Sequence, residues 1–319
     1  MVTLDRVSRV FESRRGLFGS VRRVWAVKSV SLGVGRAEAL GLVGESGSGK
    51  TTLARLMTGL LEPTSGKVLV QGADLALTSG STIRRLRRSV QMIFQDPVSA
   101  LDPRQTVFEA LAEVVTIGGE KGRRNIRERI ESTLSMVELR PEDSSRYPHE
   151  LSGGQCQRVG IARALISSPA VLIADEPVAH LDVSTQAAIV SLLARLRSRL
   201  GLTVVLIAHD LSMVRQAVDR VAVILNGRIV EAAPVGEMFS RPLHPYTQAL
   251  LEAVPRPGRP PRGGAEGDPG GWSSGSGDAA CPYVRRCPGR REGCESGPVD
   301  LTPAGGPTHW VRCPYVRPE

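Results

Sequence analysis

Eight consecutive residues have the types and spacing that bind a phosphate chain. Residues 44–51 read Gly-Glu-Ser-Gly-Ser-Gly-Lys-Thr and match the pattern G-x-x-x-x-G-K-[ST] at every fixed position. Glycines allow successive backbone N–H groups to point at one anion. Lys50 can then reach the β- and γ-phosphates, and the Thr51 hydroxyl can bind Mg²⁺. The alternative is a glycine-rich turn that matches the pattern by accident.

The flanking residues provide the context that this motif requires. An apolar run at 39–43 predicts a buried strand before the motif, and residues 52–57 predict a helix after it. The positive end of that helix would add to the attraction for an anion. We therefore predict an ATP site. Its residues are Gly44, Glu45, Ser46, Gly47, Ser48, Gly49, Lys50, Thr51 and Thr52.

Three further polar residues follow apolar runs that predict buried strands. The run at 171–174 ends in Asp175 and Glu176, and the run at 202–208 ends at His209. Adjacent buried carboxylates are costly unless a cation accompanies them, so we predict that Asp175 holds Mg²⁺ and that Glu176 polarises an attacking water. His209 could contact a γ-phosphate. A structural ion pair is the alternative role for the two acids.

A second candidate anion site begins at Ser152. Residues 152–155 read Ser-Gly-Gly-Gln, and apolar residues at helical spacing follow them. This pattern predicts that Ser152, Gly153, Gly154 and Gln155 lie at the N-terminus of a helix, where backbone N–H groups attract anions. An ordinary helix start explains the same residues almost as well.

The remaining elements indicate a mixed α/β chain. Residues 1–38 contain short alternating runs that predict strands, with a polar loop expected at 13–23. Residues 98–150 predict a helical insert, and Asn226-Gly227 predicts a tight hairpin turn. Phe11 and Trp25 could each stack on an adenine ring, although packing is the alternative for either ring.

Composition limits the class of protein. The chain has 319 residues, of which 41% are hydrophobic and 4% aromatic, so it can form an aliphatic core. We find no signal peptide and no apolar run of about 20 residues that would span a bilayer. The net charge is +9, but the arginines are spread along the chain, which suits a solvated or membrane-facing surface as well as nucleic acid. We expect a soluble cytoplasmic protein.

The C-terminal residues have a different composition. Residues 256–280 are rich in Gly, Pro and Ser and predict a flexible linker. Four cysteines follow within residues 281–319, and three of them precede proline. In a reducing compartment we expect a metal-binding tail, with a [4Fe-4S] cluster favoured over Zn²⁺ by the wide spacing. An unliganded, reduced tail is the alternative. The candidate ligands are Cys281, Cys287, Cys294 and Cys313.

Taken in order, these motifs resemble those of the ATP-binding subunits of ABC transporters. The phosphate loop, Gln95, residues 151–155, the Asp175-Glu176 pair and His209 look like the Walker A, Q-loop, signature, Walker B and switch-histidine motifs. The resemblance covers about residues 1–255. Finer features resemble the oligopeptide/dipeptide/nickel permease branch, and the loop before Trp25 resembles its second ATPase subunit. These features are residues 94–97, 100–103, 146–150 and 244–247.

This resemblance implies a fold and further site residues. The expected fold is α/β, a P-loop NTPase with a RecA-like core, an N-terminal antiparallel β subdomain and a helical subdomain at about 98–165. A Cys-rich extension follows at 281–319. Gln95 would join Glu176 and His209 in catalysis, and Thr51 and Asp175 in holding Mg²⁺. Phe11 would stack on adenine, and Asp182 and residues 152–155 would contact nucleotide.

The resemblance also implies partners. Two ATPase subunits would sandwich ATP, here as a heterodimer with a second ATPase subunit. Two integral membrane permease subunits and an extracytoplasmic substrate-binding protein would complete an importer for oligopeptides or dipeptides, with no nucleic acid involved. The chain would lie on the cytoplasmic face of the membrane. Alternatives are a nickel or other small-solute importer, and a soluble ABC ATPase that does not act in transport. Two departures from the family pattern are His180 in residues 179–182 and Cys156 after the signature.

Overall fold

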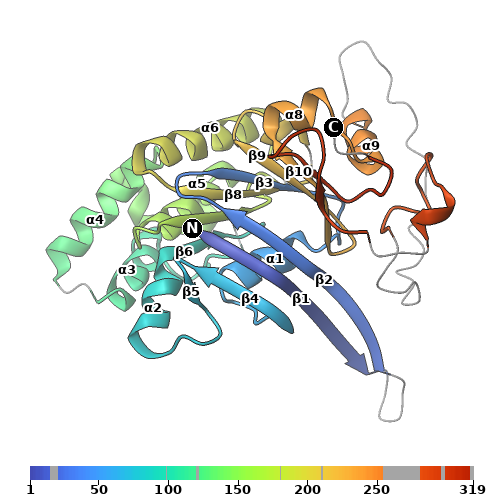
Figure 1. Cartoon of the computed structure of the whole chain (residues 1–319). Coiled ribbons are helices and arrows are strands. Elements are labelled where there is room, and N and C mark those ends of the chain that lie inside the picture. The colour runs from blue at the N-terminus through green and yellow to red at the C-terminus, as the bar shows by residue number, and fades with distance from the viewer. Residues whose placement is uncertain are drawn as a thin grey trace.

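An eight-stranded mixed sheet forms the centre of the computed structural model, which describes residues 1–14, 21–97, 99–119, 122–179, 181–209, 211–253, 281–295 and 299–316. The strand order is β11-β12-β10-β9-β3-β8-β7-β6 (Figure 1). Five neighbouring strands are parallel: β9 (Arg220–Leu225), β3 (Ala39–Val43), β8 (Thr203–Ala208), β7 (Val171–Asp175) and β6 (Val90–Ile93). Beyond them β10 (Arg228–Pro234), β12 (Trp310–Val311) and β11 (Thr302–Pro303) pair antiparallel.

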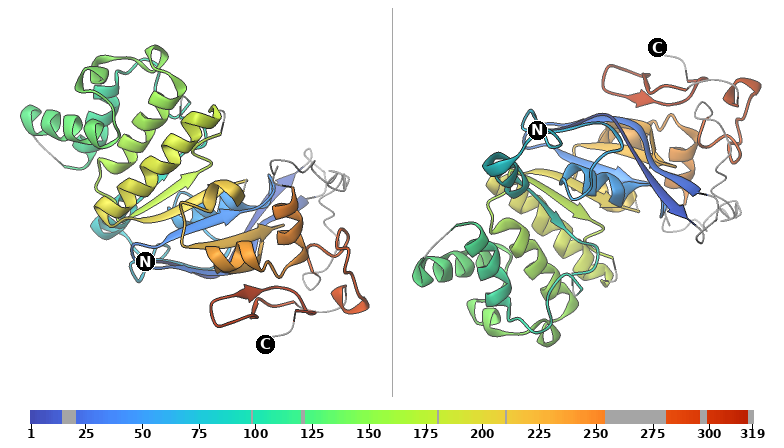
Figure 2. Two further views of the ribbon diagram at one scale, coloured as in Figure 1. Left: turned by 90° about the horizontal axis from the view of Figure 1, so that it is seen from above. Right: turned by 90° about the horizontal axis from the view of Figure 1, so that it is seen from below.

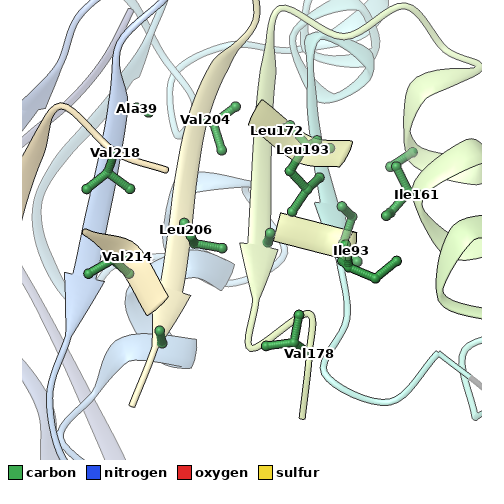
Figure 3. Close-up of a cluster of buried hydrophobic side chains, with 14 of the residues drawn as sticks. Ala39, Ile93, Ile161, Leu172, Val178, Leu193, Val204, Leu206, Val214 and Val218 are labelled. Carbon is green, nitrogen blue, oxygen red and sulfur yellow. The ribbon is translucent and has the colours of Figure 1, made fainter. Parts of the chain in front are cut away.

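The parallel strands read as continuous apolar runs because both faces of the sheet are covered. Side chains alternate between two cores: in β3, Ala39 and Val43 enter one core, whereas Leu40 and Leu42 enter the other. The first core lies beneath α5 (Gly153–Leu165) and α6 (Val183–Leu200). In Figure 3, Ile161 of α5 and Ile93 of β6 point toward one another within it.

A second, antiparallel sheet covers the other face together with α1 (Lys50–Met57) and α2 (Gly80–Ser89). Its order is β2-β1-β4-β5, formed by β1 (Val2–Arg14), β2 (Val21–Val34), β4 (Ser65–Val70) and β5 (Ala73–Asp74). The expected polar loop at 13–23 is wrong at both ends, because cross-strand pairing extends to Arg14 and resumes at Val21. Residues 15–20 lie outside the described residues.

The helical insert between β6 and β7 is confirmed. It contains α3 (Val107–Ile117), α4 (Arg123–Met136) and the short 3-10 helices η1 (Pro141–Ser145) and η2 (Pro148–Glu150), before α5. Ile130 and Leu134 of α4, four positions apart on one helical face, are fully buried. Figure 2 shows α3 and α4 at one end of the molecule, with the C-terminal strands at the other. Shorter helices complete the chain: α7 (Leu211–Val214), α8 (Val235–Ser240), α9 (Pro245–Glu252) and η3 (Glu292–Cys294).

The C-terminal residues pack against the edge of the main sheet. Strand β12 pairs with β10, with Val311 opposite Glu231. The His309 Nε2 atom lies 2.7 Å from Glu231 Oε1, and both side chains are buried. The two-residue strands of this tail had no sequence signal. The predicted linker at 256–280 lies outside the described residues, and no described helix is long and apolar enough to cross a membrane.

Candidate nucleotide-binding site

The ammonium group of Lys50 lies inside the curve of the phosphate loop. Its Nζ donates to the carbonyl oxygens of Gly44 at 2.7 Å and Glu45 at 2.9 Å, and the residue is 4% exposed. Burial lowers the pKa of Lys50, while the charges of Glu176 and Asp175 oppose that change. The loop therefore holds a buried cation on its own carbonyls, and phosphate oxygens could replace them as stronger acceptors.

Two positions of the loop must be glycine, because neighbouring backbone atoms leave no room for a Cβ atom. Gly49 has φ +108°, and a Cβ there would lie 2.3 Å from the Ala26 carbonyl oxygen of β2. A Cβ at Gly44 would lie 2.2 Å from the Ile224 carbonyl oxygen of β9. Any side chain at either position would displace a strand, so these glycines let the loop sit directly against β2 and β9.

Asp175 lies at the carboxyl end of β7, next to the start of α1. Thr51 Oγ1 donates to Asp175 Oδ1 at 3.3 Å, and Asp175 is 2% exposed. Burial raises the pKa of Asp175, and the neighbouring Glu176 charge adds to the effect. A buried carboxylate beside a hydroxyl is an oxygen donor pair of the kind that Mg²⁺ binds, and the cation would stabilise the charged acid. These residues fit Mg²⁺.

Glu176 has contacts with two other predicted site residues. Its Oε2 accepts a hydrogen bond from Gln95 Nε2 at 2.9 Å, and its Oε1 lies 3.7 Å from Lys50 Nζ. The residue has φ +45°, a strained conformation for a non-glycine residue. Strain of this kind occurs where the surrounding structure holds a functional side chain. The structure thus brings Lys50, Gln95 and Glu176 together around one carboxylate.

His209 is exposed and follows β8. It lines a small cavity that Glu176 and Ala179 also line. The structure therefore places His209 on the same side of the sheet edge as Glu176, at the carboxyl ends of the parallel strands, which is where ligands bind in open α/β sheets.

The structure does not place the second candidate anion site, residues 152–155, beside the phosphate loop. Ser152 is the N-cap of α5, as expected, and accepts from the Gln155 backbone N–H at 3.2 Å. The α5 helix packs on β6, α3, α4 and α6 rather than on α1. A Cβ at Gly154 would lie 2.8 Å from the Thr185 side chain, so that glycine lets α5 approach α6.

Asp182 has a local structural role that sequence reasoning missed. Its carboxylate caps α6 by accepting from the Thr185 backbone N–H at 2.9 Å and from Thr185 Oγ1 at 2.7 Å. A hydrogen bond from the Ser184 hydroxyl, together with these two bonds from Thr185, lowers the pKa of Asp182. An Asp followed by Ser and Thr before a helical run was an available signal for this cap.

The two candidate adenine-stacking rings lie on the hairpin next to the loop. Trp25 pairs with Val10 and Phe11 pairs with Val24, directly beside Ala26, whose carbonyl approaches Gly49. Successive pairs point to opposite faces, so the two rings do not share a surface. The Arg9 guanidinium lies 4.9 Å from the centre of the Phe11 ring.

Tyr246 and Arg286 contact the loop although no motif spacing indicated this. The Tyr246 hydroxyl accepts from the Glu45 backbone N–H at 3.0 Å, and Arg286 forms an ion pair with the Glu45 carboxylate at 2.9 Å. Both lie about 200 or more positions from the loop in sequence, so only the tertiary fold could reveal them.

Four cysteines line one cavity in the tail. Its volume is about 180 Å³, and Leu243, His244 and Tyr315 also line it. All the cysteines are free, and burial raises the pKa of the Cys281 and Cys287 thiols. Among the described residues, however, no group of three or more His, Cys, Asp or Glu side chains is placed to hold a metal ion. The described residues therefore give no support to the expected metal site, whether [4Fe-4S] or Zn²⁺, although the four cysteines line one cavity. The lining cysteines are Cys281, Cys287, Cys294 and Cys313.

Together the sheet, the phosphate loop and the carboxylates at the strand ends define a P-loop nucleotide-binding protein. Residues 27–179 match the ABC transporter family, and residues 230–294 match the oligopeptide/dipeptide transporter C-terminal region. The chain is 38% identical over 335 residues to the oligopeptide transport ATP-binding protein AppF of Bacillus subtilis, covering 98% of this chain and 96% of that protein. It is 48% identical over 233 residues to OppF of Escherichia coli, covering 73% and 70% respectively.

A solved structure with the same fold is a dimeric, post-hydrolysis ATP-binding cassette, MJ0796, bound to ADP and Pi. The TM-score is 0.65 at 30% identity, covering 74% of this chain and 99% of that one. The chain belongs to the ATPase subunits of ABC transporters, in the group that carries the oligopeptide/dipeptide transporter C-terminal region.

Proposed function

We propose that this chain hydrolyses ATP to drive peptide import, as the energy-coupling subunit of an oligopeptide or dipeptide importer. The observation that carries the proposal is the convergence of Lys50, Gln95 and Glu176, with the Thr51–Asp175 pair adjacent. Relatives of similar length named for oligopeptide transport support the class of cargo, and a 46% identical relative from Brucella ovis named as a putative peptide import ATP-binding protein supports the direction of transport.

The chain's own residues divide the work of the reaction. The loop N–H groups and Lys50 bind the phosphates, and Thr51, Asp175 and Gln95 would hold Mg²⁺, which neutralises charge on the phosphates when bound. Glu176 orients and polarises a water through its carboxylate, which the Gln95 amide already holds at 2.9 Å. His209 contacts the γ-phosphate from the neighbouring strand end. Phe11 stacks on the adenine ring.

The catalytic unit is a dimer in which the signature residues 152–155 complete the partner's site. Two facts support this: within one chain α5 is packed away from the phosphate loop, and the similar ATP-binding cassette is described as dimeric. We propose a heterodimer with a second ATPase subunit, bound to two membrane permease subunits on the cytoplasmic face and served by a substrate-binding protein.

Cysteine crosslinking tests the dimer. A cysteine at Ser152 should crosslink to a cysteine in the partner ATPase's phosphate loop when ATP is present. Crosslinks that form only between identical chains would rule out the heterodimer. Reconstitution of the assembled complex tests the function: ATP should drive peptide uptake into vesicles, and ATP hydrolysis without any dependence on membrane subunits or peptide would contradict it.

For the four cysteines we propose a [4Fe-4S] cluster rather than Zn²⁺. Zinc sites typically use close C-x2-4-C pairs, whereas at least five residues separate successive cysteines here. A four-iron cluster is larger, and the thiols surround a cavity of about 180 Å³. Protein purified without oxygen should be brown and contain iron and sulphide in equal amounts. Colourless protein with four titratable thiols and no metal would refute this assignment.

A further inference from the structure

The cysteine-containing segment, residues 281–295, binds the phosphate loop through Arg286. Both terminal nitrogens of the guanidinium take part: Nη1 donates to Glu45 Oε2 at 3.0 Å, and Nη2 donates to Glu45 Oε1 at 2.9 Å. A two-point contact between planar groups fixes their relative orientation as well as their distance. The tail is therefore joined to the nucleotide site by a specific contact.

Two tilted aromatic rings, Tyr246 and Tyr283, hold the backbone of Glu45. The Tyr246 hydroxyl accepts from the Glu45 N–H at 3.0 Å. The Tyr283 ring packs on Tyr246 with 5.4 Å between ring centres, and the Arg286 guanidinium lies 5.6 Å from the centre of the Tyr283 ring. Tyr246 is 1% exposed, so this ring is fixed by its surroundings.

Glu45 connects these contacts to the phosphate-binding lysine. Its carbonyl oxygen accepts from Lys50 Nζ at 2.9 Å, so one residue contacts Arg286 through its carboxylate, Tyr246 through its N–H and Lys50 through its C=O. Position 45 is not one of the fixed positions of the phosphate-loop motif. Its side chain is thus available for a contact specific to chains that carry this tail.

A second contact reaches the other end of the loop. The Asn226 side chain donates to the Pro282 carbonyl at 3.5 Å, and the next residue, Gly227, donates its N–H to the Ser48 carbonyl at 2.8 Å. The β9–β10 turn thereby lies between the segment and the loop. Pro282 and Arg286 lie on either side of Tyr283 in sequence. Pro282 contacts the β9–β10 turn that supports the loop, and Arg286 contacts the loop itself.

We propose that this segment sets the conformation of the phosphate loop, with Arg286 as a positioning residue, so that ATP affinity depends on the state of the four cysteines. Cys281 and Cys287 bracket Pro282, Tyr283 and Arg286 in sequence and line the tail cavity. Any ligand or chemical change that shifts these thiols shifts the residues between them. This inference rests on one part of the proposed function, the binding of ATP by the phosphate loop.

The first experiment compares Arg286→Ala with Arg285→Ala in the full chain, by titration with a fluorescent ATP analogue. Among the described residues Arg285 is an exposed neighbour that forms no ion pair with Glu45, so it controls for loss of one positive charge. Arg286→Ala should weaken ATP binding about threefold to fivefold, the range of a half-exposed ion pair. In the assembled transporter it should raise KM for ATP and leave kcat unchanged. Equal affinities for the two variants would overturn the proposal.

The second experiment links the contact to the cysteines. Cys294→Ser should weaken ATP binding in the wild-type background but not further in Arg286→Ala, because the two changes act through one contact. Additive losses in the double variant would show that the cysteines act by another route, and would refute the link. Thermal unfolding identifies any variant that fails to fold. For such a variant Tyr283→Leu, which removes the ring contact while keeping all thiols, takes its place in the same titration.

The proposed function is tested separately by Lys50→Ala. If Lys50→Ala abolishes nucleotide binding while Arg286→Ala binds as tightly as wild type, the ATP site stands and the positioning role fails. If Lys50→Ala binds ATP normally, the proposed nucleotide site itself fails, whatever Arg286 does.

Discussion

Replacement of Glu176 by glutamine should separate ATP binding from ATP hydrolysis. The glutamine has nearly the same shape and keeps an oxygen for the Gln95 Nε2 hydrogen bond, which is 2.9 Å long in the structure. It loses the negative charge that polarises water. It also removes the carboxylate that lies 3.7 Å from Lys50 Nζ and competes with phosphate for that ammonium group.

The two effects have different expected sizes. A positioned general base contributes about 10² to 10⁴-fold to a rate, or roughly 3 to 5 kcal/mol of barrier, so hydrolysis should fall by that factor. Because a competing anion beside Lys50 is lost, ATP affinity should be unchanged or tighter, within about threefold. The closed, ATP-bound dimer should accumulate as a consequence.

Steady-state phosphate release by the assembled transporter measures the rate, and nucleotide titration measures the affinity. Glu128→Gln is the matched control, since Glu128 lies on the surface of α4 with Arg124 as its ion-pair partner, away from the phosphate loop. Turnover within about tenfold of wild type would mean that Glu176 is not the base. A loss of ATP binding equal to the loss of rate would also refute the reasoning.

Three further predictions concern buried ionisable side chains. Lys50→Ala should weaken ATP binding by at least about tenfold, since a charge-assisted hydrogen bond contributes about 1.5–3 kcal/mol; unchanged affinity by titration would contradict this. Burial lowers the pKa of His244 to about 4 from 6.5, so protonation favours the unfolded chain and stability should fall as pH drops below the unfolded value. The loss should be about 2 kcal/mol near about pH 5. In the structure the Tyr246 backbone N–H donates to His244 Nδ1 at 3.1 Å, and His244→Asn keeps an acceptor for this bond. The variant should therefore show a flatter dependence of stability on pH in denaturant titrations. An unaltered pH profile would exclude His244 as the cause. Glu231→Ala leaves two backbone N–H groups and His309 without their acceptor. It should lower the free energy of unfolding by about 3–5 kcal/mol. A loss under about 1 kcal/mol would mean that the tail does not depend on this carboxylate.

The catalytic core was predictable because its motifs combine a chemical requirement with a local structure. The phosphate loop needs glycine where β2 and β9 approach, and its flanking strand and helix are continuous with it in sequence. The Asn226-Gly227 turn was predictable for a similar reason: both residues have positive φ, as the tight hairpin requires. The paired carboxylates followed a strand that reads as apolar on both faces.

The tail was not predictable in the same way. Strands β11 and β12 have two residues each, too few for periodicity, and β12 forms by pairing with β10 about 80 positions earlier. The buried Glu231 that holds His309 lies in an otherwise apolar strand and carries no motif. The metal prediction used the number and spacing of cysteines, but spacing along a chain without regular structure does not determine distances between thiols. Binding of a [4Fe-4S] cluster by these four cysteines therefore remains a prediction.

The arrangement of the two anion sites explains why one chain would bind ATP without completing its hydrolysis site. The phosphate loop, Asp175 and Glu176 meet at the carboxyl ends of β3 and β7, whereas Ser152 caps a helix that packs on the helical insert. The Ser152 hydroxyl accepts the Gln155 N–H, and a hydroxyl that accepts one hydrogen bond can still donate another. Such a donor at a helix N-terminus is suited to a γ-phosphate that a second chain presents. Pairing of two chains would therefore complete each site, and release of the cleaved phosphate that both chains share would break the contact.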